Sequence, residues 1–249
     1  MFRLRSLALV AAGLLAVTAA PGGAAPATSV DVFTGIRPGA LMVSPSQCTM
    51  GFVFQTTEGA FDPAQQLYIG TAAHCVGSVG QHVSLRVISP TDGLPVTVDI
   101  GTVAVLGGGA FTDDFALVAI DPALSSWVSP SVAHWGGPTG ADLTSGPGTG
   151  ITFTGHGLDV TTGPGYPRAG VLGFRAPGYV KWFGATLGGD SGGPVTTAAG
   201  LAVAGHKGLV VNTDGMAVGV SIQSMLTIGG KPLSTCPSRT PWPLPGCPG

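Results

Sequence analysis

Charged side chains are scarce in this sequence. Asp, Glu, Lys and Arg make up only 9% of its 249 residues, and the formal net charge is −2. No stretch gathers lysine and arginine into the basic surface that binding to nucleic-acid phosphates requires. No two cysteines and no two histidines have the spacing of a zinc site. We therefore expect no nucleic-acid partner and no metal.

Long apolar runs are missing beyond the N-terminal region, because Gly, Pro, Ser and Thr interrupt every candidate. In that region two arginines precede an apolar stretch at 7–20, and the Ala-Pro-Ala at 25–27 has the form of a signal-peptidase site. The stretch is shorter than the roughly 20 residues that a membrane-spanning helix needs. We interpret residues 1–27 as a signal peptide, which predicts a secreted, extracellular chain with no membrane attachment after its removal.

Helical periodicity is absent as well, since no window of helical length repeats its apolar residues every 3.6 positions. The apolar residues come in short runs, many of them β-branched or alternating, and Gly, Pro, Asp or Ser bound each run. This pattern predicts an all-β chain, and strands at such spacing favour barrels or sandwiches. The runs form two comparable sets on either side of a stretch rich in Gly and Pro.

The predicted organisation after the signal peptide has four parts. An N-terminal β-domain covers 28–125, a linker covers 126–150 and a C-terminal β-domain covers 151–230, before a Pro-rich tail at 231–249. Together they hold on the order of 220 residues, enough to bury a real core in one large or two small domains. We expect a monomer.

The chain contains four cysteines, Cys48, Cys75, Cys236 and Cys247. An even number in an exported protein predicts two disulfides. The sequence leaves all three pairings open. Pairing Cys48 with Cys75 and Cys236 with Cys247 closes the shortest loops, and it leaves one disulfide in each half of the chain.

The most informative stretch is the Gly-Gly-Asp-Ser-Gly-Gly-Pro at 188–194. Acyl transfer needs a hydroxyl on a sharp turn, with backbone N–H groups directed at the oxygen that becomes negative. Ser191 supplies the hydroxyl, and the N–H groups of Gly189 and Ser191 can form the oxyanion hole. The alternative for such a stretch is an ordinary Gly-rich hairpin.

Two further stretches supply a base and a carboxylate. His74 follows a short apolar strand and precedes Cys75, which can anchor it while its protonation changes. Asp114 leads into an apolar strand, where a buried carboxylate needs a hydrogen-bond donor, and we propose His74 Nδ1 as that donor. Asp113 is the competing carboxylate, and we interpret it as a solvated turn residue.

These stretches resemble the motifs of the chymotrypsin-like serine peptidases. The chain has Thr-Ala-Ala-His-Cys at 71–75, Asp-Phe-Ala-Leu at 114–117 and Gly-Asp-Ser-Gly-Gly-Pro at 189–194, in the order of that family. The resemblance covers about residues 47–228. It implies two six-stranded antiparallel β-barrels, an active site in the cleft between them, and a protein or peptide substrate. It also implies a catalytic triad made by His74, Asp114 and Ser191. It further implies a disulfide between Cys48 and Cys75.

The chain departs from animal members of the family at one point that matters for Asp190. Those members begin with Ile-Val-Gly-Gly, whose amino group pairs with the aspartate before the serine, and no such sequence occurs near residue 28. Asp190 must therefore find another cation. The candidates are Arg168, Arg175 and the N-terminus that cleavage creates.

The residues that set specificity depart from the trypsin-like pattern. Ala185 stands where trypsin-like members have an aspartate that binds Lys or Arg, so we do not expect trypsin-like cleavage. Thr186 and His206 match the Thr and His that bind the substrate carboxylate in glutamyl endopeptidases of this family. A small apolar pocket with His206 packed against its strand is the alternative. Lys207 either reinforces an anionic preference or points to solvent.

Together these features predict a secreted serine endopeptidase that forms an acyl-enzyme on Ser191 and needs no cofactor. At the P1 position of its substrate we expect Glu or a small residue. An inactive binding module on the same fold and an esterase that uses the same triad are the alternatives.

Overall fold

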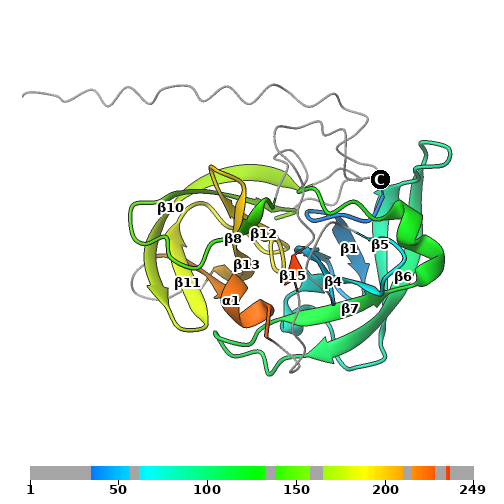
Figure 1. Ribbon diagram of the computed structural model, residues 1–249, viewed down its shortest axis with the longest axis horizontal. Coiled ribbons are helices and arrows are strands. Elements are labelled where there is room, and N and C mark those ends of the chain that lie inside the picture. Colours follow the sequence, from blue (N-terminus) through cyan, green and yellow to red (C-terminus); the bar gives the residue numbers. More distant parts are fainter. Residues whose placement is uncertain are drawn as a thin grey trace, which may run out of the picture.

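A computed structural model describes residues 35–56, 62–132, 138–157, 165–209, 215–227 and 234–235. In this part of the chain almost every regular element is a β-strand, and the strands form two sheets that lie side by side (Figure 1). The all-β, two-barrel prediction is confirmed. The residues predicted as a signal peptide, as well as Cys236 and Cys247, lie outside the described residues.

The first sheet has the order β15-β3-β4-β7-β6-β5-β1-β2. Its strands are β1 (Leu41–Ser44), β2 (Cys48–Thr49), β3 (Val53–Gln55), β4 (Leu67–Thr71), β5 (His82–Ile88), β6 (Pro95–Leu106), β7 (Ala116–Ile120) and β15 (Ser234–Thr235). β2 and β3 belong to one continuous segment, so the sheet curls until its two ends meet in that segment. Hydrogen bonds from Met50 N to Ala40 O (2.9 Å) and from Gly51 N to Gly70 O (2.6 Å) join it to both sides.

The second sheet closes into a six-stranded antiparallel barrel in the order β12-β9-β10-β11-β14-β13, because β13 also pairs with β12. Its strands are β9 (Gly150–Gly155), β10 (Tyr166–Ala176), β11 (Tyr179–Phe183), β12 (Pro194–Thr197), β13 (Leu201–Leu209) and β14 (Ala217–Ser221). β8 (Gly140–Ala141) runs parallel to β13 at the edge of the barrel. β8 falls in the stretch predicted as a linker, and β15 falls in the stretch predicted as a tail and pairs with β3.

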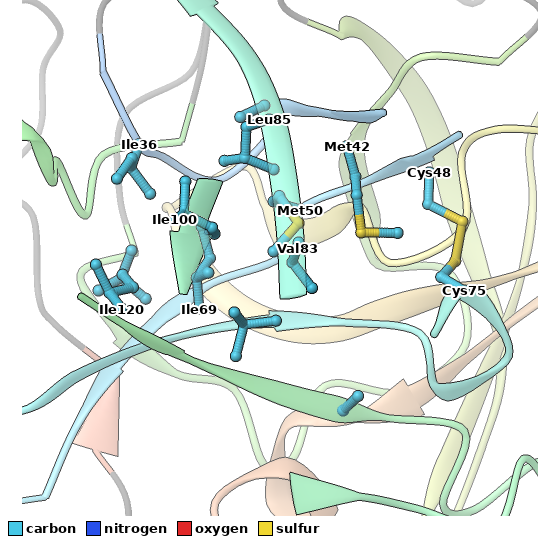
Figure 2. Close-up of a cluster of buried hydrophobic side chains, with 14 of the residues drawn as sticks. Ile36, Met42, Cys48, Met50, Ile69, Cys75, Val83, Leu85, Ile100 and Ile120 are labelled. Atoms are coloured by element: carbon cyan, nitrogen blue, oxygen red, sulfur yellow. A yellow bond between two sulfur atoms is a disulfide. The ribbon is translucent and has the colours of Figure 1, made fainter. Parts of the chain in front are cut away.

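Alternating side chains fill the interior of each barrel. On β5, Val83, Leu85 and Val87 are buried while the residues between them are partly or fully exposed, as expected for a strand with one face against a core. Figure 2 shows how side chains from several strands meet in the first barrel. The second barrel has its own core around Trp182, whose side chain is fully buried.

A third apolar cluster joins the two barrels. Phe52, Phe54 and Phe115 come from the first half of the chain, and Val220 and Met225 come from the second. Burial of apolar surface stabilises a fold by about 25 cal/mol for each Å² removed from water. The shared cluster therefore fixes the position of the barrels relative to each other, and with it the position of residues that the two halves contribute to one site.

The helices are short. The 3-10 helices η1 (Ala73–Cys75) and η2 (Pro122–Trp127) and the single turn α1 (Ile222–Met225) are the helical elements in the described ranges. None of them is long and apolar enough to cross a membrane.

Candidate active site

Asp114 and His74 are joined by two hydrogen bonds. Asp114 lies just before β7, and its side chain is fully buried. The carboxylate accepts from the backbone N–H of His74 at 2.9 Å (Oδ1) and lies 2.8 Å from His74 Nδ1 (Oδ2). Burial by itself raises the pKa of Asp114, but hydrogen bonds from His74 and Lys207 outweigh it and hold the pKa below its usual range. The ionised carboxylate makes Nδ1 the donor, which leaves Nε2 as an acceptor.

The competing carboxylate, Asp113, stays within its own loop. Its Oδ2 accepts from the N–H of Gly108 at 3.1 Å. The preference for Asp114 over Asp113 as the partner of His74 therefore agrees with the geometry.

A disulfide fixes the residue that follows His74. Cys75 is bonded to Cys48, as the resemblance implied, and both belong to the first barrel. The two sulfur atoms and a ring nitrogen of His74 lie within 4.8 Å of one another. Because both sulfurs share one disulfide, neither is a thiolate that could bind a metal. The cysteines hold the histidine in place and do not form a metal centre with it.

Ser191 lies on the turn between β11 and β12. Gly192 follows it with a φ of +90°, and a Cβ there would lie 2.1 Å from the carbonyl oxygen of Thr49. The Ser191 carbonyl accepts from Thr49 N at 2.8 Å, and Gly192 N donates to His206 O at 2.6 Å. Backbone contacts to both barrels therefore hold the turn, and only glycine fits at position 192.

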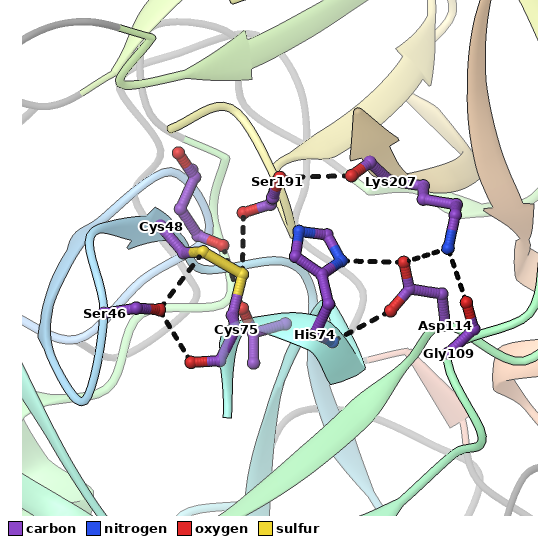
Figure 3. A network of polar contacts seen from close by, with 10 residues as sticks. Ser46, Cys48, His74, Cys75, Gly109, Asp114, Ser191 and Lys207 are labelled. Carbon is purple, nitrogen blue, oxygen red and sulfur yellow. Dashed lines mark hydrogen bonds and ion pairs between the residues drawn. A yellow bond between two sulfur atoms is a disulfide. The ribbon is translucent and has the colours of Figure 1, made fainter. Parts of the chain in front are cut away.

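The hydroxyl of Ser191 donates to the carbonyl oxygen of Lys207 at 3.1 Å. The imidazole of His74 lies between Ser191 and Asp114 (Figure 3). Among the described residues, His74 and Asp114 are hydrogen-bonded to each other. Ser191 donates to Lys207 and makes no hydrogen bond to His74, so the triad implied by the resemblance is not fully hydrogen-bonded. Hydrogen bonds in unliganded active sites are often formed only when substrate binds.

Two backbone N–H groups beside Ser191 are available. Among the described residues, neither the N–H of Gly189 nor that of Ser191 donates a hydrogen bond, whereas the N–H groups of Asp190, Gly192 and Gly193 all do. Gly189 has a φ of +101°, a conformation that favours glycine. These are the two donors that the sequence predicted for an oxyanion.

Asp190 pairs with Arg168, one of the three cations that the sequence offered. Arg168 Nη1 donates to Asp190 Oδ2 at 2.7 Å, and Nη2 donates to Oδ1. The N–H groups of Gly157 and Leu187 each donate to the same carboxylate at 2.7 Å. Arg175, a second candidate, instead contacts Asp142. Arg168 is therefore the cation that pairs with Asp190, and it does so through a planar guanidinium.

Lys207 is the residue whose role the sequence did not reveal. Its ammonium does not point to solvent and is not free to bind an anionic substrate. Nζ instead donates to Asp114 Oδ2 at 2.5 Å and to Gly109 O at 2.6 Å. Its side chain is only 18% exposed. Lys207 is 93 residues from Asp114 in the chain, so no local signal in the sequence could have paired them.

Comparison with solved structures identifies the fold. Thermobifida fusca protease A superposes with a TM-score of 0.55 at 23% sequence identity, over 80% of this chain and 98% of that one. A glutamic acid specific serine protease superposes with a TM-score of 0.52 at 17% identity, over 80% of this chain and all of that one. The chain has the chymotrypsin-like serine protease fold. No family model and no curated protein matches the sequence.

In the chymotrypsin-like fold of this chain two of the predicted specificity residues, Thr186 and His206, are buried, whereas Ala185 is exposed. His206 is fully buried, stacks on Phe153 at a ring distance of 5.9 Å and meets the edge of Trp182 at 5.3 Å. Burial lowers its pKa to about 4, so the imidazole is neutral near pH 7. Both of its ring nitrogens, as well as the hydroxyl of Thr186, are buried without a hydrogen-bond partner in the described part of the chain. Ala185 accepts from Arg168 Nη1 at 3.2 Å through its carbonyl oxygen.

Proposed function

We propose that this protein is a secreted serine endopeptidase that hydrolyses peptide bonds through an acyl-enzyme on Ser191. The observation that carries the proposal is the pair of hydrogen bonds by which buried Asp114 holds His74 beside Ser191. The bonds fix both the position of the ring and its tautomer, which a general base requires. The two solved structures named above are those of serine proteases, in agreement with this activity.

The first half of the reaction forms the acyl-enzyme. The Ser191 hydroxyl turns from the Lys207 carbonyl to His74 Nε2, gives up its proton there and attacks the carbonyl carbon of the substrate. The oxygen of that carbonyl becomes negative and accepts from the N–H groups of Gly189 and Ser191, an interaction typically responsible for about 100- to 1,000-fold of the rate. Asp114 stabilises the imidazolium, which then protonates the leaving amine.

The second half releases the product. Water takes the place of the amine and loses a proton to His74 as it attacks the ester on Ser191. The ester bond breaks, the new carboxylic acid leaves, and Ser191 regains its proton. The steps balance with the side chains named and one water molecule.

We propose Glu as the preferred P1 residue. Buried polar groups without partners cost about 1–3 kcal/mol each, and Thr186 Oγ1 and the two ring nitrogens of His206 are such groups. A substrate carboxylate would accept a hydrogen bond from the Thr186 hydroxyl and one from the single N–H of the neutral His206 ring. One of the structural neighbours is described as specific for glutamic acid and as using histidines to bind substrate. In a library of peptides, cleavage after Glu should be lost in His206→Phe and kept in the control Lys181→Met; unchanged selectivity would contradict the assignment.

We further propose that residues 1–27 direct export and are removed. The mature chain would then comprise barrels at 28–125 and 151–230, a linker at 126–150, and a tail at 231–249 closed by a Cys236–Cys247 disulfide. N-terminal sequencing of protein secreted by a bacterial host tests the first point, and a first residue between 21 and 28 is expected. Mass mapping of peptides under non-reducing conditions tests the second.

A fluorophosphonate probe tests the proposed catalysis directly, since it reacts with an activated serine. We expect labelling of the folded, exported protein at Ser191, abolished in Ser191→Ala and unchanged in the exposed control Ser78→Ala. A folded protein that never reacts would support the binding module. A protein that reacts with the probe and cleaves small esters but no peptides would be an esterase.

A further inference from the structure

Lys207 contacts both ends of the proposed triad. Its ammonium donates to the carboxylate of Asp114 at 2.5 Å, while its backbone carbonyl accepts from the Ser191 hydroxyl at 3.1 Å (Figure 3). The ammonium also donates to Gly109 O at 2.6 Å and lies 5.5 Å from the centre of the Phe111 ring. These contacts hold a charged group inside the protein in a fixed place, next to the acid on which His74 depends.

A cation at this place changes the charge of the site. Asp114 has no exposed side-chain surface, so water cannot screen it effectively and its charge acts strongly on His74. A negative carboxylate favours the protonated imidazole, and a positive ammonium on the same carboxylate opposes that effect. Asp114 and Lys207 together carry no net charge, whereas Asp114 alone would carry −1.

We propose that Lys207 is a positioning residue that offsets the charge of Asp114 and so keeps His74 unprotonated, and Ser191 reactive, at lower pH than the same site would allow without it. The proposal rests on the endopeptidase function proposed above. In this proposal Lys207 itself binds no substrate and transfers no proton. It acts through Asp114 on the fraction of molecules that hold a free base.

Within the described ranges, no other charged group packed around His74 supplies this effect. From β13, His206 is buried and neutral near pH 7. From the Ser191 turn, Asp190 is already paired with Arg168, which leaves that pair without net charge. From the loop before β7, Asp113 accepts from Gly108 N within its own loop, and the segment of β2 presents the disulfide. Lys207 is thus the one cation in contact with Asp114 among the described residues.

The test is the pH dependence of fluorophosphonate labelling at Ser191, measured on the folded, exported protein. In Lys207→Met the pH of half-maximal rate should rise by about one unit, as expected for a single charge acting one group away. One unit below the wild-type midpoint, that shift slows labelling about tenfold. Lys207→Gln should shift the midpoint equally, because it keeps a donor without the charge. Lys207→Arg and the matched control Lys181→Met should keep the wild-type midpoint.

The pH midpoint distinguishes an effect of the Lys207 charge on His74 from a structural role in which Lys207 only holds the loop that contains Gly109. A fall in rate by one constant factor at every pH, with the midpoint unmoved, would overturn the proposal and assign Lys207 a structural role. Failure of both neutral variants to fold, while Lys207→Arg folds, would overturn it in the same way.

A second measurement does not depend on catalysis. In Ser191→Ala protein, the NMR titration midpoint of the His74 ring should rise by about one unit when Lys207→Met is added. If wild-type protein never reacts with the probe but this midpoint moves, the endopeptidase function fails while the charge effect stands. If the probe reacts and neither midpoint moves, the charge effect fails alone.

Discussion

Two buried carboxylates flank the proposed nucleophile, and their surroundings differ. Asp190 is paired with Arg168, and two backbone N–H groups also donate to it. Asp114 is paired with Lys207, and its other donors both come from His74. Neither side chain is exposed to solvent.

The two acids differ in whether all of their hydrogen-bond donors are fixed. All donors of Asp190 come from the second half of the chain and keep their protons at any ordinary pH, so the acid holds the Ser191 turn in one shape. Asp114 comes from the first half and Lys207 from the second, so this pair crosses from one barrel to the other. One donor of Asp114 belongs to His74, the proposed general base, which would gain and lose a proton during the reaction. A buried ion pair can thus be structural, or can act on a reactive neighbour, depending on whether all its partners are fixed.

The largest expected effect is on the Asp114 side of the comparison. Asp114→Asn keeps the shape of the side chain but presents an amide that can hold the wrong tautomer of His74. In the Ser-His-Asp template the same change lowers kcat about 10⁴-fold. We expect a comparable fall in the rate of fluorophosphonate labelling, measured at pH 7 on protein whose circular dichroism is unchanged. A fall of less than about tenfold would place the orienting carboxylate elsewhere.

Breaking the Asp190 pair should act on stability. Arg168→Met leaves an unpaired buried carboxylate, and such changes cost about 3–5 kcal/mol in the free energy of unfolding. Urea denaturation measures it, and Arg86→Met, on an exposed position of β5, serves as the control with an expected change within about 0.5 kcal/mol. If both variants unfold at the same urea concentration, the Arg168–Asp190 pair does not stabilise the fold.

His206 lies close to Asp190 and makes stability depend on pH. Its pKa falls from 6.5 to about 4, mainly through burial, with Asp190 opposing the fall. Between these two pH values the unfolded chain binds a proton that the folded chain does not, so the free energy of unfolding decreases as the pH falls. The full shift amounts to about 3 kcal/mol.

His206→Phe removes the titrating group and keeps an aromatic ring against Phe153 and Trp182. The loss of stability from pH 7 to pH 4 should therefore be smaller in the variant than in the wild type by about 3 kcal/mol. Urea denaturation at the two pH values measures the difference. Equal losses in both proteins would mean that His206 is not buried in its neutral form.

The smallest effect is expected at a surface pair with almost the same contact as His74 and Asp114. His82 Nδ1 lies 2.7 Å from Asp99 Oδ2, but the two side chains are 71% and 50% exposed. Exposed pairs contribute about 0–1 kcal/mol, because water screens them. His82→Ala should therefore change the free energy of unfolding by less than about 1 kcal/mol and leave labelling of Ser191 unchanged. A larger change would show that distance matters here more than burial.

Much of the site could be predicted from short motifs. The stretch around His74 places an imidazole after a strand and beside a cysteine, and the glycines around Ser191 permit its turn, so each motif carries its own local geometry. The alternation on β5 similarly follows from its sequence. The same reasoning gave Arg168, Arg175 and a new N-terminus as equal candidates for Asp190, because a pairing across strands leaves no local trace.

The specificity residues show the same limit. Position in the motif identified Thr186 and His206, but the packing of His206 against Phe153 and Trp182 depends on three different strands of one barrel. Whether an imidazole is exposed or buried decides how far its pKa falls below the usual value. The sequence left that choice open, and the closure of the second barrel determined it.

By itself, the sequence determined the strand-rich fold class and gave His74, Asp114 and Ser191 as the proposed triad, because turns, alternation and motif chemistry are properties of neighbouring residues. Only the tertiary structure decided which cation meets which acid, Arg168 with Asp190 and Lys207 with Asp114. The physical reason is that charges interact through space, and two barrels packed on a shared apolar cluster bring together an ammonium and a carboxylate that lie 93 residues apart in the chain.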